Sequence, residues 1–153
     1  MAVIVASNLP QTSNPSTIKK PNKSYSHCCV TPILPCSKFI TIAGQTGLRD
    51  DGSSAPDIVT QAKDACNALH ECLKSVGATE RDIIHVRHYV VKESGDVQND
   101  KKPVVLRGWN EVWMEYMERE AGGHKPPGTA FGVASLAASG LLYEVEVLVI
   151  VHN

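Results

Sequence analysis

The sequence predicts one α+β domain in which two helices cover one face of a mostly antiparallel sheet. Two stretches, at about 56–77 and 103–118, carry apolar residues at helical spacing. Segments rich in β-branched residues lie before, between and after these stretches, and the last of them alternates with period two. A chain of 153 residues also fits a single core. We therefore treat residues 1–153 as a single domain.

Both predicted helices have recognisable ends. Pro56-Asp57 is a start signal for the first, and Gly77 stands where a glycine commonly ends a helix. Its apolar stripe consists of Ile58, Ala62, Ala65, Leu69, Cys72, Leu73 and Val76. The second runs from about Pro103 to Glu118, with a proline at its first turn. One of its sides carries Leu106, Trp109, Val112, Trp113 and Tyr116.

The remaining segments predict a six-stranded sheet. The six expected strands are residues 3–5, 25–31, 38–43, 83–92, 129–135 and 143–151. Residues 10–24 contain three prolines among Ser, Asn and Lys, which predicts a loop. We expect part of the segment 1–24 to be flexible.

The last predicted strand indicates that the chain assembles with copies of itself. Tyr143, Val145, Val147, Val149 and Val151 share one face, which suits a core under the helices. The opposite face carries Glu144, Glu146, Leu148, Ile150 and His152. Its apolar members need cover as well, and the two helices can cover only one face. A partner subunit is the economical solution.

Glu144 and Glu146 are the candidate acid/base residues on that second face. A carboxylate beside apolar side chains can have a raised pKa and can act in proton transfer. The alternative is that both side chains lie in water at the rim of the sheet. The residues alone leave both interpretations open.

Charge and composition exclude several classes of partner. The formal net charge is −1, so no general electrostatic field attracts nucleic acid. Residues 1–49 nevertheless hold five basic residues and no acidic one: Lys19, Lys20, Lys23, Lys38 and Arg49. This distribution is typical of a solvated basic loop, and the alternative is that some of these cations collect an anionic ligand.

The five cysteines and the apolar segments bear on compartment and metal binding. An odd number of cysteines without a C-x-x-C spacing favours a reducing compartment. Cys28 and Cys29 follow His27, but a spacing this weak does not predict a zinc site, and we expect no metal. No apolar run is long enough for a membrane span, and none suits a signal peptide. We expect a cytoplasmic protein; the acid-free, Ser/Thr-rich residues 1–24 make a mitochondrial location the second choice.

Four short motifs, in order along the chain, resemble a known family. They are Ala43-Gly44-Gln45-Thr46-Gly47, Asn110-Glu111-Val112-Trp113, Pro126-Pro127-Gly128-Thr129 and Tyr143-Glu144-Val145-Glu146. Together they resemble the Rid family, the reactive intermediate deaminases, also called the YjgF family. The resemblance runs from about Tyr25 to the C-terminus, and each motif alone is weak.

The resemblance implies a chorismate-mutase-like α+β fold and a homotrimer with clefts between neighbouring subunits. It also implies hydrolysis of enamines and imines to a ketone or keto acid and ammonia, without a metal or organic cofactor. Tyr25, Asn110 and Glu144 match positions of pocket residues in the family. Glu144 matches the carboxylate thought to position water or to shuttle the proton.

Two departures from the family pattern affect the expected pocket. The position of the arginine that binds the substrate carboxylate reads Gly128 here, and the position of a frequent pocket serine reads Ala43. Losing such a charge-assisted, two-pronged contact in a desolvated pocket costs about 2–5 kcal/mol. The candidates for a replacement cation are His124, Lys125, Arg87 and His88.

Two functions follow as expectations. The first is an enzyme of the imine or enamine class that acts on a substrate without a free carboxylate, or on a bulkier one. In it Glu144 and Tyr25 are the catalytic residues: Glu144 is the acid/base, and Tyr25 orients the substrate together with backbone donors near an enlarging Gly128. The expected substrate-binding residues are Gly128, Thr129, Asn110, Ala43, Arg87 and Lys125. The second is a non-catalytic trimer that binds a metabolite or a protein. RNA cleavage is disfavoured, because no basic stripe interleaves with aromatic residues.

Overall fold

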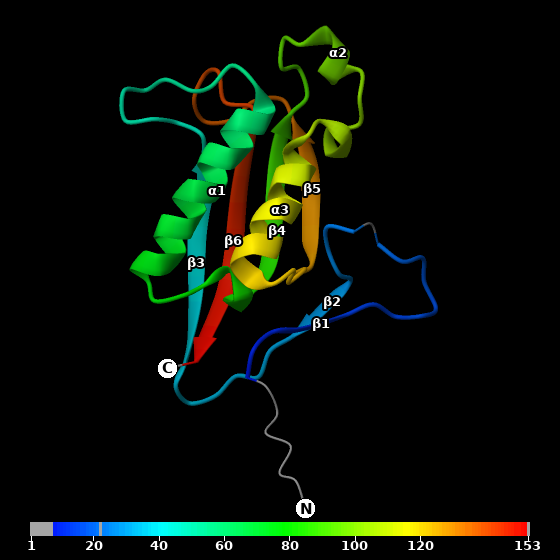
Figure 1. Ribbon diagram of the computed structural model, residues 1–153, viewed down its shortest axis with the longest axis vertical. Helices are drawn as coiled ribbons and strands as arrows, with labels where there is room; N and C mark the ends of the chain where they lie inside the picture. The colour runs from blue at the N-terminus through cyan, green and yellow to red at the C-terminus, as the bar shows by residue number, and fades with distance from the viewer. Residues whose placement is uncertain (1–7, 22, 153) are drawn as a thin grey trace, which may run out of the picture.

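The computed structural model describes residues 8–21 and 23–152. The strands are β1 (Gln11–Ser13), β2 (Cys28–Val30), β3 (Ser37–Thr46), β4 (Ile83–Val91), β5 (Gly128–Val133) and β6 (Tyr143–His152). The helices are α1 (Ile58–Ser75), α2 (Val97–Asp100) and α3 (Trp109–Ala121), with short 3-10 turns η1 (Glu80–Asp82) and η2 (Val104–Leu106). Helices α1 and α3 lie side by side on one face of a sheet in the order β3-β6-β4-β5 (Figure 1).

The sheet is mixed and mostly antiparallel, as predicted. Strand β6 pairs antiparallel with both β3 and β4, whereas β4 and β5 are parallel. The parallel pair requires a crossover connection, and α3 lies within it. The α+β class is therefore confirmed, and the crossover places the N-terminal end of α3 close to strand β5.

The predicted six-stranded sheet is not formed by the described residues. The main sheet has four strands, and β1 and β2 pair only with each other in a separate antiparallel ribbon. Pro32 and Pro35 separate β2 from β3, and proline cannot extend a ladder because it lacks an N–H group. Strand β1 lies inside the segment predicted to be a loop. The strand expected at residues 3–5 lies outside the described residues.

The first predicted helix is confirmed, with sharp ends. The Asp57 side chain accepts a hydrogen bond from the Thr60 N–H at 2.8 Å, as an N-cap residue does. Gly77 ends the helix with a φ of +72°, a conformation that favours glycine. The second helix begins later than predicted, at Trp109. Gly108, with a φ of +92°, separates it from η2, so that Pro103 precedes η2 instead.

The core lies between the two helices and the valine-rich face of β6. Ala62, Ala65 and Leu69 of α1 are fully buried, and so are Trp109 and Trp113 of α3. The alternation of β6 is as predicted, because Tyr143 and its period-two partners are all buried. Small residues on α1 allow close approach to the sheet.

The opposite face of the sheet is only partly covered by the described residues, because Ile150 on it is buried but both of its phenylalanines are exposed. Phe39 is 61% exposed and Phe131 is 41% exposed, and Phe131 stacks on Tyr89 with ring centroids 5.5 Å apart. An exposed apolar face of this kind is typical of a surface that binds another chain. The assembly predicted from Leu148 and Ile150 stays a prediction. Among the described helices, none is both long and apolar enough to cross a bilayer.

Candidate functional site

A cavity of about 430 Å³ lies between β5, the start of α3 and the segment before β2. It is lined by Ser24, Tyr25, Val86, His88, Val105, Trp109, Asn110, Gly128, Thr129 and Ala130. Four residues predicted for the site therefore meet in one place: Tyr25, Asn110, Gly128 and Thr129. The short η2 turn and the left-handed Gly108 position Asn110 here, at the start of α3.

His88 forms part of the cavity wall and is an uncharged residue. Its ring is 5% exposed and lies against Trp109 and Trp113, with centroids at 4.6 and 4.9 Å. Burial lowers the pKa of His88 to about 3. Its Nδ1 lies 2.7 Å from the Tyr143 hydroxyl. His88 is thus a hydrogen-bonded core histidine, and the idea that it replaces the missing cation is wrong.

Position 128 is closed by its neighbour on β4. A Cβ atom added to Gly128 would lie 2.7 Å from Cγ1 of Val86, which is fully buried. Val86 therefore occupies the space in which a side chain at position 128 would begin, and the expectation that Gly128 enlarges the pocket stays a prediction. Gly128 can offer a ligand only its backbone groups.

Glu144 does not line this cavity. It alternates with Tyr143 along β6, so it lies on the face of the sheet away from the helices, in register with Tyr89 of β4 and Thr46 of β3. A Cβ atom added to Gly44 would lie 2.0 Å from Oε1 of Glu144, so Gly44 makes room for this carboxyl group. The sequence placed Gly44 in a motif without indicating this role.

The surroundings of Glu144 raise its pKa. Partial burial is the main cause, and the nearby negative charge of Glu146 adds to it. This observation favours an acid/base role over a fully hydrated rim carboxylate. Arg87 donates to Glu146 at 2.5 Å, so the Arg87 guanidinium is already engaged on this face. Ala43 is exposed on β3, beside Gly44, and also lies outside the cavity.

The two remaining cation candidates lie in the loop between α3 and β5 and do not line the cavity. Lys125 is exposed and lines a neighbouring depression of about 300 Å³ that shares Ser24 with the cavity. His124 is buried and its Nε2 lies 2.7 Å from the Ile83 carbonyl oxygen. Burial lowers its pKa, so His124 is a neutral structural residue.

Gln61 of α1 has a structural role. Gln61 is fully buried, and its Nε2 donates to the carbonyl oxygens of Ala55 and Gly140 at 2.7 and 2.8 Å. Its Oε1 accepts from the Leu142 N–H at 2.8 Å. A Cβ atom on Gly47 would lie 2.9 Å from Cα of Gln61. Gly47 therefore lets the loop after β3 pack closely on α1.

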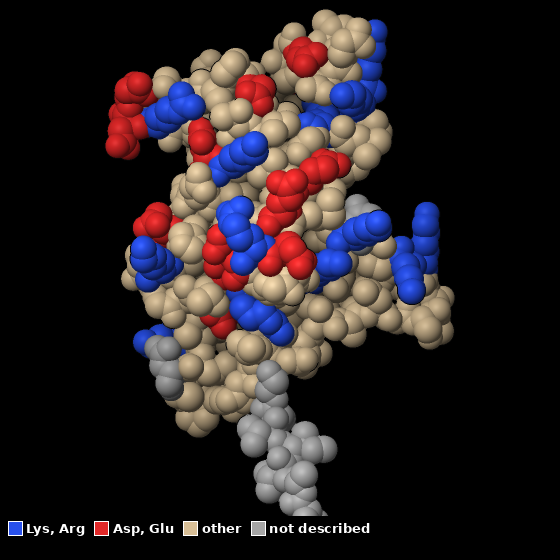
Figure 2. Space-filling model, in the orientation of Figure 1, with Lys and Arg blue, Asp and Glu red and all other residues tan. Residues whose placement is uncertain are grey.

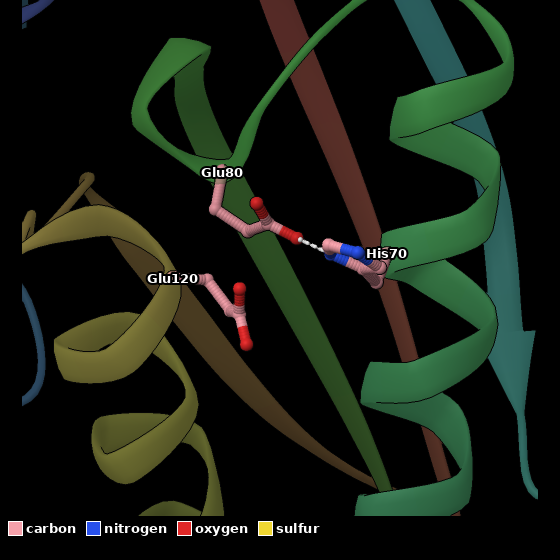
Figure 3. A group of neighbouring side chains, drawn as sticks. All are labelled: His70, Glu80 and Glu120. Atoms are coloured by element: carbon pink, nitrogen blue, oxygen red, sulfur yellow. Dashed lines mark hydrogen bonds and ion pairs between the residues drawn. The ribbon is translucent and has the colours of Figure 1, made fainter.

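One group of side chains has the composition of a metal site (Figure 3). His70 of α1, Glu80 of η1 and Glu120 of α3 place their potential ligand atoms within 4.8 Å of one another. Each is already paired: Oε1 of the buried Glu80 is bonded to His70 Nδ1 at 2.7 Å and to the Tyr116 hydroxyl. Arg119 donates to Glu120 at 2.6 Å. We interpret the group as a polar link between α1, η1 and α3.

Comparison with known proteins identifies the family. The sequence profile described as Endoribonuclease L-PSP matches residues 17–151, which include all four motifs. The chain belongs to the YjgF/Rid family. The RutC family protein YjgH of Escherichia coli K12 is 29% identical over 110 residues, covering 72% of this chain and 73% of YjgH.

Two solved structures of Rid proteins support the assignment. The YyfB protein of Yersinia pestis, a Rid protein of unknown function, is 25% identical and has a TM-score of 0.75, covering 93% of this chain and 98% of YyfB. Rv2704 of Mycobacterium tuberculosis is 30% identical with a TM-score of 0.53, covering 83% and 86% of the two chains. The Rid fold of this chain is thus shared over nearly its whole length.

Proposed function

We propose that this Rid protein is a small-molecule enzyme of the imine and enamine hydrolase type, with its chemistry adapted to a different substrate. The observation that carries the proposal is the cavity that gathers Tyr25, Asn110, Gly128 and Thr129 without a charged side chain. A ligand cavity with aromatic walls and a few polar groups suits a small, largely uncharged molecule.

The lack of a cationic side chain in the cavity restricts the class of substrate that the cavity can bind. Val86 occupies the space beside Gly128, and His88 is neutral, so among the described residues of one chain no cavity side chain can clamp a carboxylate next to the reacting carbon. We therefore expect a substrate without a free carboxylate at that carbon, or a bulkier one. Such a substrate fits a tailoring step of hydrolysis, cyclisation or isomerisation.

In the proposed hydrolysis, water adds to the carbon of the C=N bond, the nitrogen takes a proton, and the C–N bond then breaks to release ammonia and leave a carbonyl compound. Glu144, with its raised pKa, is the group proposed to supply and recover the proton. Tyr25 and the backbone near Gly128 would orient the substrate. No metal or organic cofactor takes part in the proposal.

The proposal requires a second subunit. Glu144 and the cavity lie on opposite faces of the sheet within one chain, so only the Glu144 of a neighbouring subunit can complete the cavity. We propose a homotrimer with the site at each subunit boundary. The uncovered apolar face with Phe39 and Phe131 supports an interface there.

The alternative is a non-catalytic trimer that binds a metabolite or a protein. The same observations favour it: the cavity lacks the carboxylate clamp, and a single chain does not bring an acid/base group to it. The name of the family profile refers to an RNA-cleaving activity, and the net charge of −1 does not favour that activity here.

An imine-hydrolysis assay distinguishes these functions. An amino-acid oxidase would generate imino acids in one arm, and an amine oxidase would generate carboxylate-free imines in the other. We expect faster decay of the carboxylate-free imines, and a loss of about 10²-fold or more in Glu144→Gln. Glu71→Gln, an exposed glutamate on α1, is the matched control. No turnover by a folded oligomer, together with ligand-induced thermal stabilisation, would favour the binding protein instead.

A further inference from the structure

A depression of about 560 Å³ adjoins the cavity and shares Tyr25 with it. Its other walls are Lys19, Lys20, Pro21 and His27, and no acidic residue lines it. The loop that carries these residues projects beyond β5 in Figure 1, and blue atoms at its tip in Figure 2 have no red atoms beside them. The depression is therefore lined by basic residues and shares one wall residue, Tyr25, with an uncharged cavity.

The two lysines are available for a ligand. Both side chains are exposed, and neither takes part in an ion pair within the described residues. Adjacent lysines repel each other unless an anion lies between them, and a bound anion relieves this repulsion. Two lysines without acidic partners beside a cavity are thus suited to a carboxylate or a phosphate.

His27 provides an independent observation that points to a ligand. Its Nδ1 is buried, and within the described part of the chain it has no hydrogen-bond partner. The His27 backbone N–H is held by Oδ1 of Asn14 at 2.8 Å, which fixes the residue in the loop. Buried polar atoms are almost always hydrogen-bonded, so a ring nitrogen without a protein partner, on a residue that lines this depression with two lysines, is available to an oxygen atom of a ligand.

We propose that the Lys19–Lys20–His27 depression binds the anionic group of a ligand whose uncharged part occupies the adjoining cavity. The inference rests on the proposed function in taking the cavity as the ligand site. It names the substrate class: a molecule with an apolar or planar body and a carboxylate or phosphate several bonds away. This arrangement also explains how position 128 can lack an arginine, since the charge is held outside the cavity.

Matched pairs of probes test the inference by binding. Phenylacetate through 5-phenylpentanoate would be titrated calorimetrically, each beside its neutral amide and the phenylalkyl phosphate of similar length. We expect one chain length at which the anion binds about fivefold more tightly than the amide at low salt. The preference should decrease with added salt. The comparison of acid with phosphate shows which group the site takes.

Two double variants provide the decisive comparison. Lys19→Ala/Lys20→Ala should abolish the preference for the anion while binding of the amide is unchanged. Lys101→Ala/Lys102→Ala, an exposed adjacent pair near α2, should retain the preference. Equal binding of acid and amide, absence of binding by the whole series, or a preference that survives Lys19→Ala/Lys20→Ala would overturn the inference. The inference would also be overturned if Lys19→Ala/Lys20→Ala weakened the binding of a single-stranded RNA and changed the binding of none of these small probes.

The outcome is separable from that of the proposed function. Anion preference without imine turnover would leave this binding site in place and remove the hydrolase. Turnover of carboxylate-free imines without any preference for anions would support the hydrolase and overturn the anion-binding site.

Discussion

At the scale of single residues, two side chains of β4 determine the free volume and the charge of the cavity. Val86 fills the volume beside Gly128, and His88 contributes a neutral ring where a cation would serve a carboxylate. The sequence identified Gly128 as a departure, but it did not indicate that a β4 side chain compensates. Contacts between neighbouring strands depend on register, which a single sequence does not contain.

His88 should make the stability of the protein depend on pH. Its pKa in the folded protein is about 3, below its ordinary value of 6.5, so the unfolded chain binds more protons between these values. Stability should therefore fall as the pH drops below about 6.5. From pH 7 to pH 5 the contribution of His88 is a loss of about 2 kcal/mol of unfolding free energy.

Urea unfolding of the wild type and His88→Asn at pH 7 and pH 5, at equal protein concentration, measures this contribution. The variant should lose about 2 kcal/mol less than the wild type over that interval. Tyr143→Phe is the control, since it removes the hydrogen bond but keeps the titrating ring. An identical pH dependence in wild type and His88→Asn would contradict the buried, neutral state.

At the scale of elements, the periodicity of apolar residues predicted the helices and strands better than the sequence predicted which strands pair. The apolar stripe of α1 and the alternation of β6 are features of short sequence windows. The alternation was correct, and the stripe was correct except at its end, where Cys72 is half-buried and Val76 is exposed. The β1–β2 ribbon and the late start of α3 were missed. The ribbon depends on contacts between distant segments, and the start of α3 depends on one left-handed glycine, Gly108.

The candidate site was predicted in a similar, partial way. Family resemblance gave the positions of Tyr25, Asn110, Gly128 and Thr129, and the fold brings them together. Trp109 as a wall of the cavity was missed, because an apolar residue on a helix stripe predicts only core. The period of β6 placed Glu144 on the face opposite Tyr143, but it did not indicate on which face the cavity lies. Glu144 was therefore expected in the pocket, and within one chain it does not line the cavity.

Gln61 should be the side chain on which the loops around α1 depend most. It makes three hydrogen bonds to backbone groups while fully buried, so its removal leaves several polar groups unsatisfied. Gln61→Leu should lower the unfolding free energy by about 3 kcal/mol. Gln98→Leu, on the exposed surface of α2, should change it by less than about 0.5 kcal/mol. Equal midpoints for the two variants in chemical unfolding would contradict this role.

At the scale of the whole molecule, the sheet divides the proposed site into two halves. The cavity lies on the helix side, at the β5 edge, and Glu144 lies on the uncovered side with Glu146 and Arg87. Neither half forms a complete acid/base site. The proposed site is therefore shared between subunits, and each cavity receives the Glu144 of a neighbour.

Mixed assembly of two inactive variants tests this central claim most directly. Asn110→Trp would fill the cavity, and Glu144→Gln would remove the acid/base group. Each homotrimer should be inactive in the imine assay. Trimers assembled from both chains should regain up to about one quarter of the wild-type rate, because some boundaries then combine an intact cavity with an intact Glu144.

A chain carrying both changes, co-assembled with Glu144→Gln chains, is the control and should stay inactive. Native mass spectrometry would verify that mixed trimers have formed. Restored turnover in the first mixture alone is the result that the account predicts. Mixed trimers that remain as inactive as their parents, although the wild type turns over, would contradict a site shared between subunits.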